Sequence, residues 1–146
     1  MKEPIYNKKT MDHIINPKNG YEMENPDGLA LVGDPGCGDT LKLYVKVENN
    51  VITETSFQVV GCGAAIASAS ATTVLLKGKT LEEARNITNQ HIVDFLGGLP
   101  PEKIHCSVMA KQSIEKALDD YKSKIAALYA GQDHTYPFLF GNSGQS

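Results

Sequence analysis

Residues 40–48 read TLKLYVKVE, and aliphatic side chains occupy every second position of this stretch. Because successive side chains of a strand point to opposite faces, this alternation predicts a half-buried β-strand. Asn49 and Asn50 come next, and asparagine tolerates the positive φ angles that a tight hairpin turn needs. Residues 51–60 (VITETSFQVV) then predict a second strand, paired antiparallel with the first.

Helical patterns surround this predicted hairpin. Residues 63–77 are rich in alanine and contain no internal glycine or proline. The longest pattern, residues 107–130, places apolar side chains every three to four positions and stops at Gly131. A shorter strand is predicted at residues 29–32, a polar loop or arm at 16–28, and further helices at 6–15, 80–88 and 91–96.

This order of elements predicts an α+β domain, in which a small antiparallel three-stranded sheet carries helices on one face. A chain of 146 residues is long enough to bury one such core. We expect residues 1–130 to form the domain and residues 131–146 to be a partly disordered C-terminal tail.

Charge and composition exclude several classes of function. The net charge is −3 and no basic stripe runs along the chain, so we expect neither nucleic acid nor a membrane as a partner. The longest apolar stretch is interrupted by glycine, serine and threonine, and we find no secretion signal. Three cysteines are an odd count, which argues against a closed disulfide framework and for reduced thiols, so a cytoplasmic location is expected. The absence of a Cys-x-x-Cys pair gives no support to a thioredoxin-like redox motif or an ordinary zinc ribbon.

Each of the three cysteines falls where two predicted elements meet. Cys37 and Cys62 each stand between two glycines, which permit sharp bends and close approach of a ligand. Cys62 and Cys106 precede predicted helices, where unpaired N–H groups and the helix dipole favour the thiolate. We therefore interpret these thiols as presented to a ligand rather than packed in a core.

An oxygen donor and a nitrogen donor, both harder metal ligands than sulfur, lie next to the cysteines in the sequence. Asp39 follows Cys37 by two positions and shares its side in an extended segment, and His105 adjoins Cys106. Taken singly, these residues have ordinary explanations as a turn aspartate, a surface or capping histidine and core cysteines. Taken together, three thiolates with an oxygen or nitrogen donor suit zinc or an iron–sulfur cluster, and suit calcium or magnesium poorly.

Three motifs then resemble the IscU/NifU-type iron–sulfur cluster assembly scaffolds. They are VGDPGCGD, GCGAAIASAS and LPPEKIHCS, at residues 32–39, 61–70 and 99–107. The resemblance extends over residues 6–129, and the short run between the second and third cysteines leaves no room for the insertion of the zinc-binding SufU-like branch. It implies a SufE/NifU-like fold, with a short antiparallel sheet, covering helices and a site at one end.

The resemblance also implies a ligand set and a role. Cys37, Cys62 and Cys106 would be the ligands of a 2Fe–2S cluster or, as a second choice, of a 4Fe–4S cluster. Because ligand type separates zinc from iron poorly, we also expect zinc in the cluster-free form. Asp39 or His105 would complete the coordination in different states. Such a protein is a scaffold for cluster assembly and is not an enzyme.

Partners follow from the same resemblance. They are a cysteine desulfurase that supplies persulfide sulfur, apo iron–sulfur proteins that receive the cluster, a frataxin-like regulator and a chaperone pair. The chaperone reads the segment that corresponds to Leu99 through Lys103, where Glu102 stands in place of the valine of the familiar bacterial form. A cluster shared between two copies of the chain is a further expectation.

Two hypotheses concern individual residues. Asp39 is the weak ligand whose loss lets the cluster leave, so Asp39→Ala should slow transfer and lengthen cluster lifetime. Cys106 is the persulfide acceptor, with Lys103 helping to hold its thiolate.

Two other functions remain as alternatives. One is a zinc-binding sulfur relay that serves a cysteine desulfurase and holds no cluster. The other is a Cys-His hydrolase that uses Cys106, but the sequence offers no group to orient His105, and we expect the two adjacent side chains to point apart.

Overall fold

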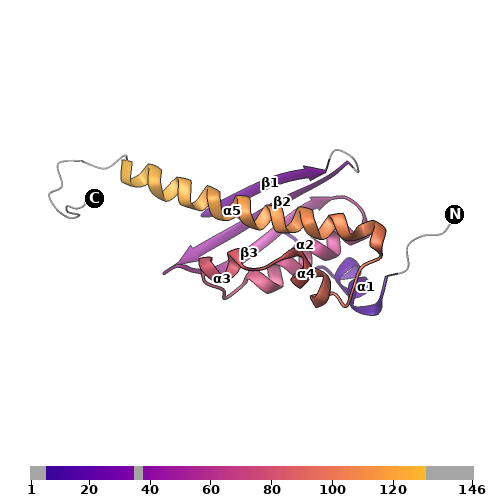
Figure 1. The fold of residues 1–146 in the computed structure, drawn as a ribbon. Helices are drawn as coiled ribbons and strands as arrows, with labels where there is room; N and C mark the ends of the chain where they lie inside the picture. The colour runs from indigo at the N-terminus through magenta and orange to yellow at the C-terminus, as the bar shows by residue number, and fades with distance from the viewer. Residues whose placement is uncertain (1–5, 35–37, 131–146) are drawn as a thin grey trace.

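The computed structural model of the chain describes residues 6–34 and 38–130. Figure 1 shows three strands with the helices gathered against them and the last helix running along the sheet. In chain order the elements are α1 (Lys8–Ile15), β1 (Gly28–Asp34), β2 (Asp39–Glu48), β3 (Val51–Val60), α2 (Gly63–Leu76), α3 (Leu81–Arg85), α4 (Asn89–Phe95), the 3-10 turn η1 (Pro101–Lys103) and α5 (Ile104–Ala130).

The three strands form one antiparallel sheet in the order β1-β2-β3. Leu43 lies opposite Phe57 across the β2–β3 pair, and both are buried on the inner face. The turn between these strands uses Asn49 at φ 53° and Asn50 at φ 66°, so the predicted hairpin is confirmed. β1 extends beyond the four residues predicted for it, because its register with β2 continues to the pair of Asp34 and Asp39.

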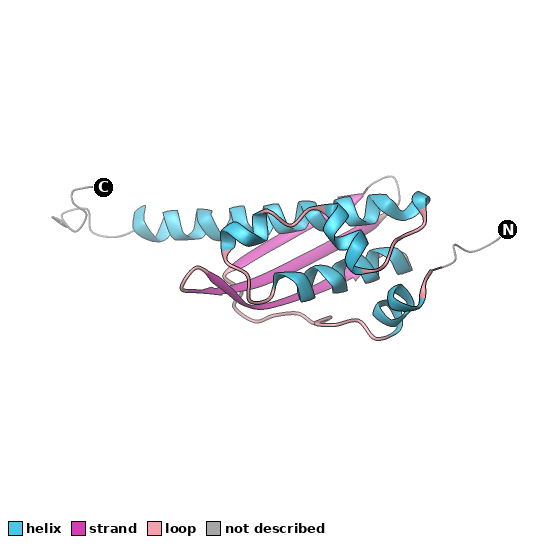
Figure 2. Cartoon of the chain, turned by 60° about the horizontal axis from the view of Figure 1, so that its bottom comes forward, coloured by secondary structure: helices cyan, strands magenta, loops and turns pink. Residues whose placement is uncertain are grey.

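All the helices that cover the core lie on one face of the sheet, as Figures 1 and 2 show. α2 is lined with small buried residues such as Ala67 and Ala71, which let its backbone approach the sheet closely. α5 crosses β1 at Gly28, where an added Cβ would lie only 2.5 Å from the Ala117 carbonyl oxygen. The predicted α+β architecture, with helices on one face, is therefore confirmed.

The segment between α1 and β1 packs against the sheet (Figure 2). The Asn19 carbonyl accepts a 2.9 Å hydrogen bond from the Phe57 N–H, and Met23 is buried. Of the two expectations for this segment, a loop or a mobile arm, the structure supports the packed loop. Sequence periodicity could not reveal this because the segment has no regular pattern to read.

The start of the last helix differs from the prediction. α5 begins at Ile104, three residues before the predicted start, because the proline-initiated turn η1 leads directly into it. Cys106 therefore lies inside the first turn of α5 rather than before it. The predicted capping box at Thr80 is present. The proposed tail, residues 131–146, lies outside the described residues.

Candidate metal and cluster site

Three ligand-type side chains converge from three different elements. Asp39 opens β2, Cys62 is the N-cap of α2, and Cys106 stands in the first turn of α5. One ligand atom from each lies within 4.8 Å of the other two. β2 and α5 begin at the same end of the molecule, which brings the three together (Figure 1). Cys37, the remaining predicted thiol, lies outside the described residues.

The two described sulfurs have the spacing of metal ligands. Cys62 Sγ lies 3.7 Å from Cys106 Sγ, and both thiols are free. Two thiolates about 2.3 Å from one tetrahedral zinc ion would be separated by about 3.8 Å. The sulfurs therefore fit around a tetrahedral metal without moving. Iron–sulfur clusters are also held by cysteine thiolates, so the same donor pair suits them.

Asp39 supplies the observation that points most directly to a cation. The residue is 5% exposed, and no described group donates a hydrogen bond to its buried Oδ2 atom. A buried polar atom without a partner costs free energy, and for a carboxylate beside two sulfurs a bound cation is one explanation. A metal ion beside the two sulfurs would satisfy this oxygen. The residues present therefore fit the group that the sequence motifs imply.

The glycines that flank the cysteines make room for this arrangement. A Cβ on Gly61 would lie 2.8 Å from the Asp39 carboxyl carbon, and one on Gly63 would lie 2.9 Å from Ile14 Cδ1. Gly38, next to the third cysteine, has φ +73°, which few other residues tolerate. The Gly-Cys-Gly motifs thus have identified structural reasons at these three positions, namely close approach and left-handed backbone.

Burial and neighbouring charges shift the pKa values of two groups at the site, the Cys106 thiol and the Lys103 ammonium. Burial raises the pKa of the fully buried Cys106 thiol, and the neighbouring Cys62 charge raises it further. The Cys62 charge also raises the pKa of the Lys103 ammonium, which therefore stays protonated close to this sulfur. The sequence linked Lys103 to Cys106, whereas in the structure its largest electrostatic neighbour is Cys62.

His105 turns toward its own neighbour. Its Nε2 atom lies 3.6 Å from Cys106 Sγ. The expectation that adjacent side chains point apart is therefore wrong, because the first helical turn lets this imidazole fold back. The contact does not make a hydrolase site, since the Cys106 sulfur is fully buried and closed to a substrate. His105 instead places a nitrogen donor at the edge of the ligand group.

Tyr6 is a residue of this region that the sequence did not single out. Burial raises the pKa of its hydroxyl, and the charge of Cys62 contributes in the same direction. The tyrosine ring lies beside the start of α2, since a Cβ built on Gly63 would be 3.4 Å from Tyr6 Cε2. The sequence presented Tyr6 only as the beginning of a helix, because its nearness to Cys62 arises from packing between α1 and α2.

The chain belongs to the family described as the NifU-like N terminal domain, whose model matches residues 5–127. The resemblance inferred from the motifs is therefore confirmed. Among the curated relatives, the iron-sulfur cluster assembly scaffold protein IscU of Escherichia coli is 46% identical over 126 residues, covering 84% of this chain and 98% of that protein. IscU 1 of Archaeoglobus fulgidus is 45% identical over 120 residues, covering 82% and 78%.

Solved structures show the same fold. A SUF-system iron-sulfur cluster assembly scaffold protein from Fervidobacterium islandicum superimposes with a TM-score of 0.65 at 23% identity, covering 77% of this chain and 96% of that one. The N-terminal part of a NifU-like protein from Brucella abortus gives a TM-score of 0.55 at 22% identity, covering 88% and 96%. At these identities the likeness establishes the fold alone. Within the described ranges, no helix is both long and apolar enough to cross a membrane.

Proposed function

We propose that this chain is a scaffold on which iron–sulfur clusters are assembled and from which they pass to apo-proteins. The observation that carries the proposal is the convergence of Asp39, Cys62 and Cys106, with one ligand atom of each within 4.8 Å of the others and with a buried Asp39 oxygen that has no described partner. Support also comes from the curated relatives, which are named iron-sulfur cluster assembly scaffold proteins. The chain holds and releases a cargo and is not itself an enzyme.

The ligand set suits a cargo that must leave. Cys37, Cys62 and Cys106 hold a 2Fe–2S cluster, or in a second form a 4Fe–4S cluster, through thiolates. Asp39 supplies a weaker oxygen ligand at the remaining position. His105 lies close enough to Cys106 to take the place of Asp39 as the non-thiolate ligand. A cluster with one weak ligand is open to attack by an acceptor at that corner. Zinc occupies the same donors when no cluster is present.

Sulfur enters through Cys106. Its thiolate attacks the outer sulfur of a cysteine desulfurase persulfide, the S–S bond of the donor breaks, and the electron pair leaves on the donor cysteine. Cys106 thereby becomes the persulfide, and the Lys103 ammonium offsets its negative charge. Burial closes the Cys106 sulfur to the donor and raises the pKa of its thiol, so the segment from Leu99 to Lys103 has to open before the thiol loses its proton and attacks. Mass spectrometry of a desulfurase mixture should find the first persulfide on the peptide 104–111; persulfide on Cys62 first would contradict this step.

We propose further partners for cluster assembly and release. They are apo iron–sulfur proteins, a frataxin-like regulator, a chaperone pair at the segment from Leu99 to Lys103, and a second copy of the chain that shares the cluster. The setting is cytoplasmic.

A zinc-binding sulfur relay is the second candidate, because a 3.7 Å sulfur separation fits zinc as well as it fits iron. Anaerobic reconstitution with iron and sulfide separates the two candidates. A brown chromophore that Cys62→Ser abolishes supports the scaffold. A colourless protein that retains one zinc per chain under the same conditions supports the relay. Thr80→Val, which alters a helix cap away from the sulfurs, is the matched control and should reconstitute normally.

A further inference from the structure

Helix α1 is tied to the turn that follows α4. The Asn7 side-chain amide donates to the Gly98 carbonyl over 3.3 Å, and the Thr10 hydroxyl donates to the Leu96 carbonyl over 3.2 Å. Thr10 is fully buried, so water cannot replace the partner of its hydroxyl. The chain runs from this turn through η1 to Cys106. α1 therefore holds one end of the segment that leads to this sulfur.

The same region contacts the start of α2. A Cβ built on Gly63 would lie 2.9 Å from Ile14 Cδ1 and 3.4 Å from Tyr6 Cε2. Gly63 is the first residue of α2 and directly follows the N-cap Cys62. α1, with the tyrosine that precedes it, therefore contacts the start of the segment that carries Cys62 and the turn from which the chain leads to Cys106. These two segments are far apart in the sequence.

We propose that α1 acts as a brace that sets the separation of Cys62 and Cys106, with Asn7 and Thr10 as positioning residues. The inference rests on the proposed function, since it concerns the same metal site. A metal that needs both sulfurs binds only the state in which both segments are docked. Any undocked fraction lowers the apparent affinity in proportion.

Asn7→Asp distinguishes the two roles of Asn7, which are the hydrogen bond to Gly98 and the capping of α1. The Asn7 side-chain oxygen accepts the 2.8 Å hydrogen bond from the Thr10 N–H, and aspartate keeps this capping oxygen. Aspartate lacks the amide donor and turns a second oxygen toward the Gly98 carbonyl. The helix start is retained, because a negative charge there is favourable. Only the tie to the turn is lost.

Substitutions of Thr10 test the positioning role independently, because a valine removes the hydroxyl and a serine keeps it. Thr10→Val keeps the shape of the side chain and removes the hydroxyl that donates to Leu96, whereas Thr10→Ser keeps the hydroxyl. A purely steric role would make the valine variant behave like the native chain. A positioning role makes the serine variant recover the native metal affinity.

The measurement uses the full chain and Zn²⁺ as the probe. Competition with a chromophoric chelator gives the zinc dissociation constant, and we expect it to rise about three- to tenfold in Asn7→Asp and in Thr10→Val. Hydrogen exchange gives a second readout. Zinc should slow exchange in residues 7–15 and 99–106 of the native chain, and the slowing of residues 7–15 should be lost in Asn7→Asp.

The control is Thr80→Val, which removes a helix cap of comparable worth on α3. Its zinc affinity should equal that of the native chain. Equal weakening in Thr80→Val would show that lost global stability explains the effect and would overturn the brace. Native affinity in both Asn7→Asp and Thr10→Val would overturn it too, while leaving the proposed function intact. A native chain that binds no zinc would overturn the proposed function and the brace together.

Discussion

The two ends of this molecule treat their carboxylates in opposite ways: two half-buried carboxylates at one end have partners, and a buried carboxylate at the other has an oxygen with no described partner. At the far end of α5, Asp120 accepts a 2.9 Å hydrogen bond from the Leu29 N–H and pairs with the Lys124 ammonium at 3.0 Å. Asp27 accepts from the Val47 N–H at 2.8 Å. At the cysteine end, Asp39 Oδ2 is buried with no described donor. The satisfied carboxylates hold the fold together, and the unsatisfied one points to a ligand.

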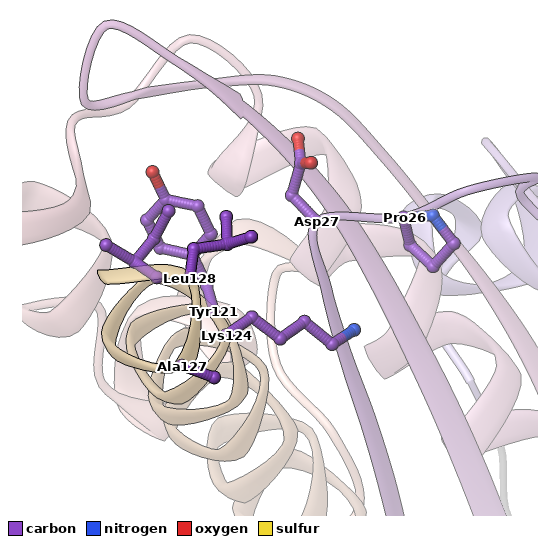
Figure 3. Close-up of a pocket in the computed structure, with 7 residues that line it drawn as sticks. Pro26, Asp27, Tyr121, Lys124, Ala127 and Leu128 are labelled. Carbon is purple, nitrogen blue, oxygen red and sulfur yellow. The ribbon is translucent and has the colours of Figure 1, made fainter. Parts of the chain in front are cut away.

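The far end also shows that a hollow alone does not locate function. Figure 3 shows the space between the loop at Asp27 and the last turns of α5. It measures about 420 Å³ and is lined by Pro26, Asp27, Tyr121, Lys124, Ile125, Ala127 and Leu128. The charged groups on its wall already have partners inside the chain. Chemistry, and not the size of a cavity, distinguishes the cysteine end.

The largest expected effect comes from removing a sulfur ligand. Cys62→Ser should weaken zinc binding by more than about a hundredfold, since even changes behind the ligands cost ten- to a hundredfold. The matched change at the other end, Asp120→Asn, should leave zinc affinity unchanged. Chelator competition on both variants checks this. Native affinity in Cys62→Ser would remove the basis of the site.

Gly61→Ala should have the next largest effect. The added methyl group would lie 2.8 Å from the Asp39 carboxyl carbon and would displace this carboxylate. We expect zinc affinity to fall about tenfold, as for a supporting residue of a metal site. Gly20→Ala is the control, because its Cβ would meet Phe57 at an ordinary 3.6 Å. Equal affinities in the two variants would mean that the carboxylate is not a ligand.

The carboxylate comparison itself predicts stability changes of opposite sign. In the metal-free chain, Asp39→Ala should raise the free energy of unfolding by about 1 kcal/mol, because it removes a buried atom without a partner. Asp120→Ala should lower it by about 1 kcal/mol, because the Leu29 N–H loses its acceptor. Urea unfolding of both variants measures the two signs. A loss of stability in Asp39→Ala would mean that this carboxylate has a stabilising partner.

With a cluster bound, Asp39→Ala tests the release of the cluster. We expect slower transfer to an apo-acceptor and a longer cluster lifetime, because the weak ligand whose dissociation exposes the cluster to the acceptor is gone. Circular dichroism in the visible range follows transfer in real time. Transfer and lifetime equal to those of the native chain would argue against Asp39 as the labile ligand.

The smallest effect concerns the pH dependence of stability and comes from His13 in α1, which belongs to neither group of carboxylates. Burial lowers the pKa of His13, the charges of Lys18 and Lys9 lower it further, and Asp12 opposes them. Its Nδ1 lies 2.7 Å from the Ser70 hydroxyl, and its ring packs edge-on against Phe95. The unfolded chain therefore binds a proton at this histidine more readily than the folded chain does.

Stability should consequently fall as pH drops below about 6.5, by at most about 1.4 kcal/mol per pH unit. His13→Gln should flatten this dependence between about pH 7 and pH 5, and urea titrations across that range measure it. The same slope in His13→Gln and in the native chain would assign the acid sensitivity to another group.

Features that depend on near neighbours could be predicted from the sequence. The β2–β3 hairpin follows from period-two alternation and two asparagines, and the Thr80 cap follows from residues three apart. The motifs around the three cysteines also indicated the family. All of these signals are local, because backbone propensity and capping act over a few residues.

Features that depend on packing could not be predicted in this way. The early start of α5, the loop that packs against β3, and the position of Tyr6 near Cys62 all arise between segments distant in the chain. By itself the sequence determined the strands, the caps and the choice of sulfur donors. Only the tertiary structure decided that Asp39 is buried without a partner and that Cys62 lies 3.7 Å from Cys106, because burial and distance result from the whole fold.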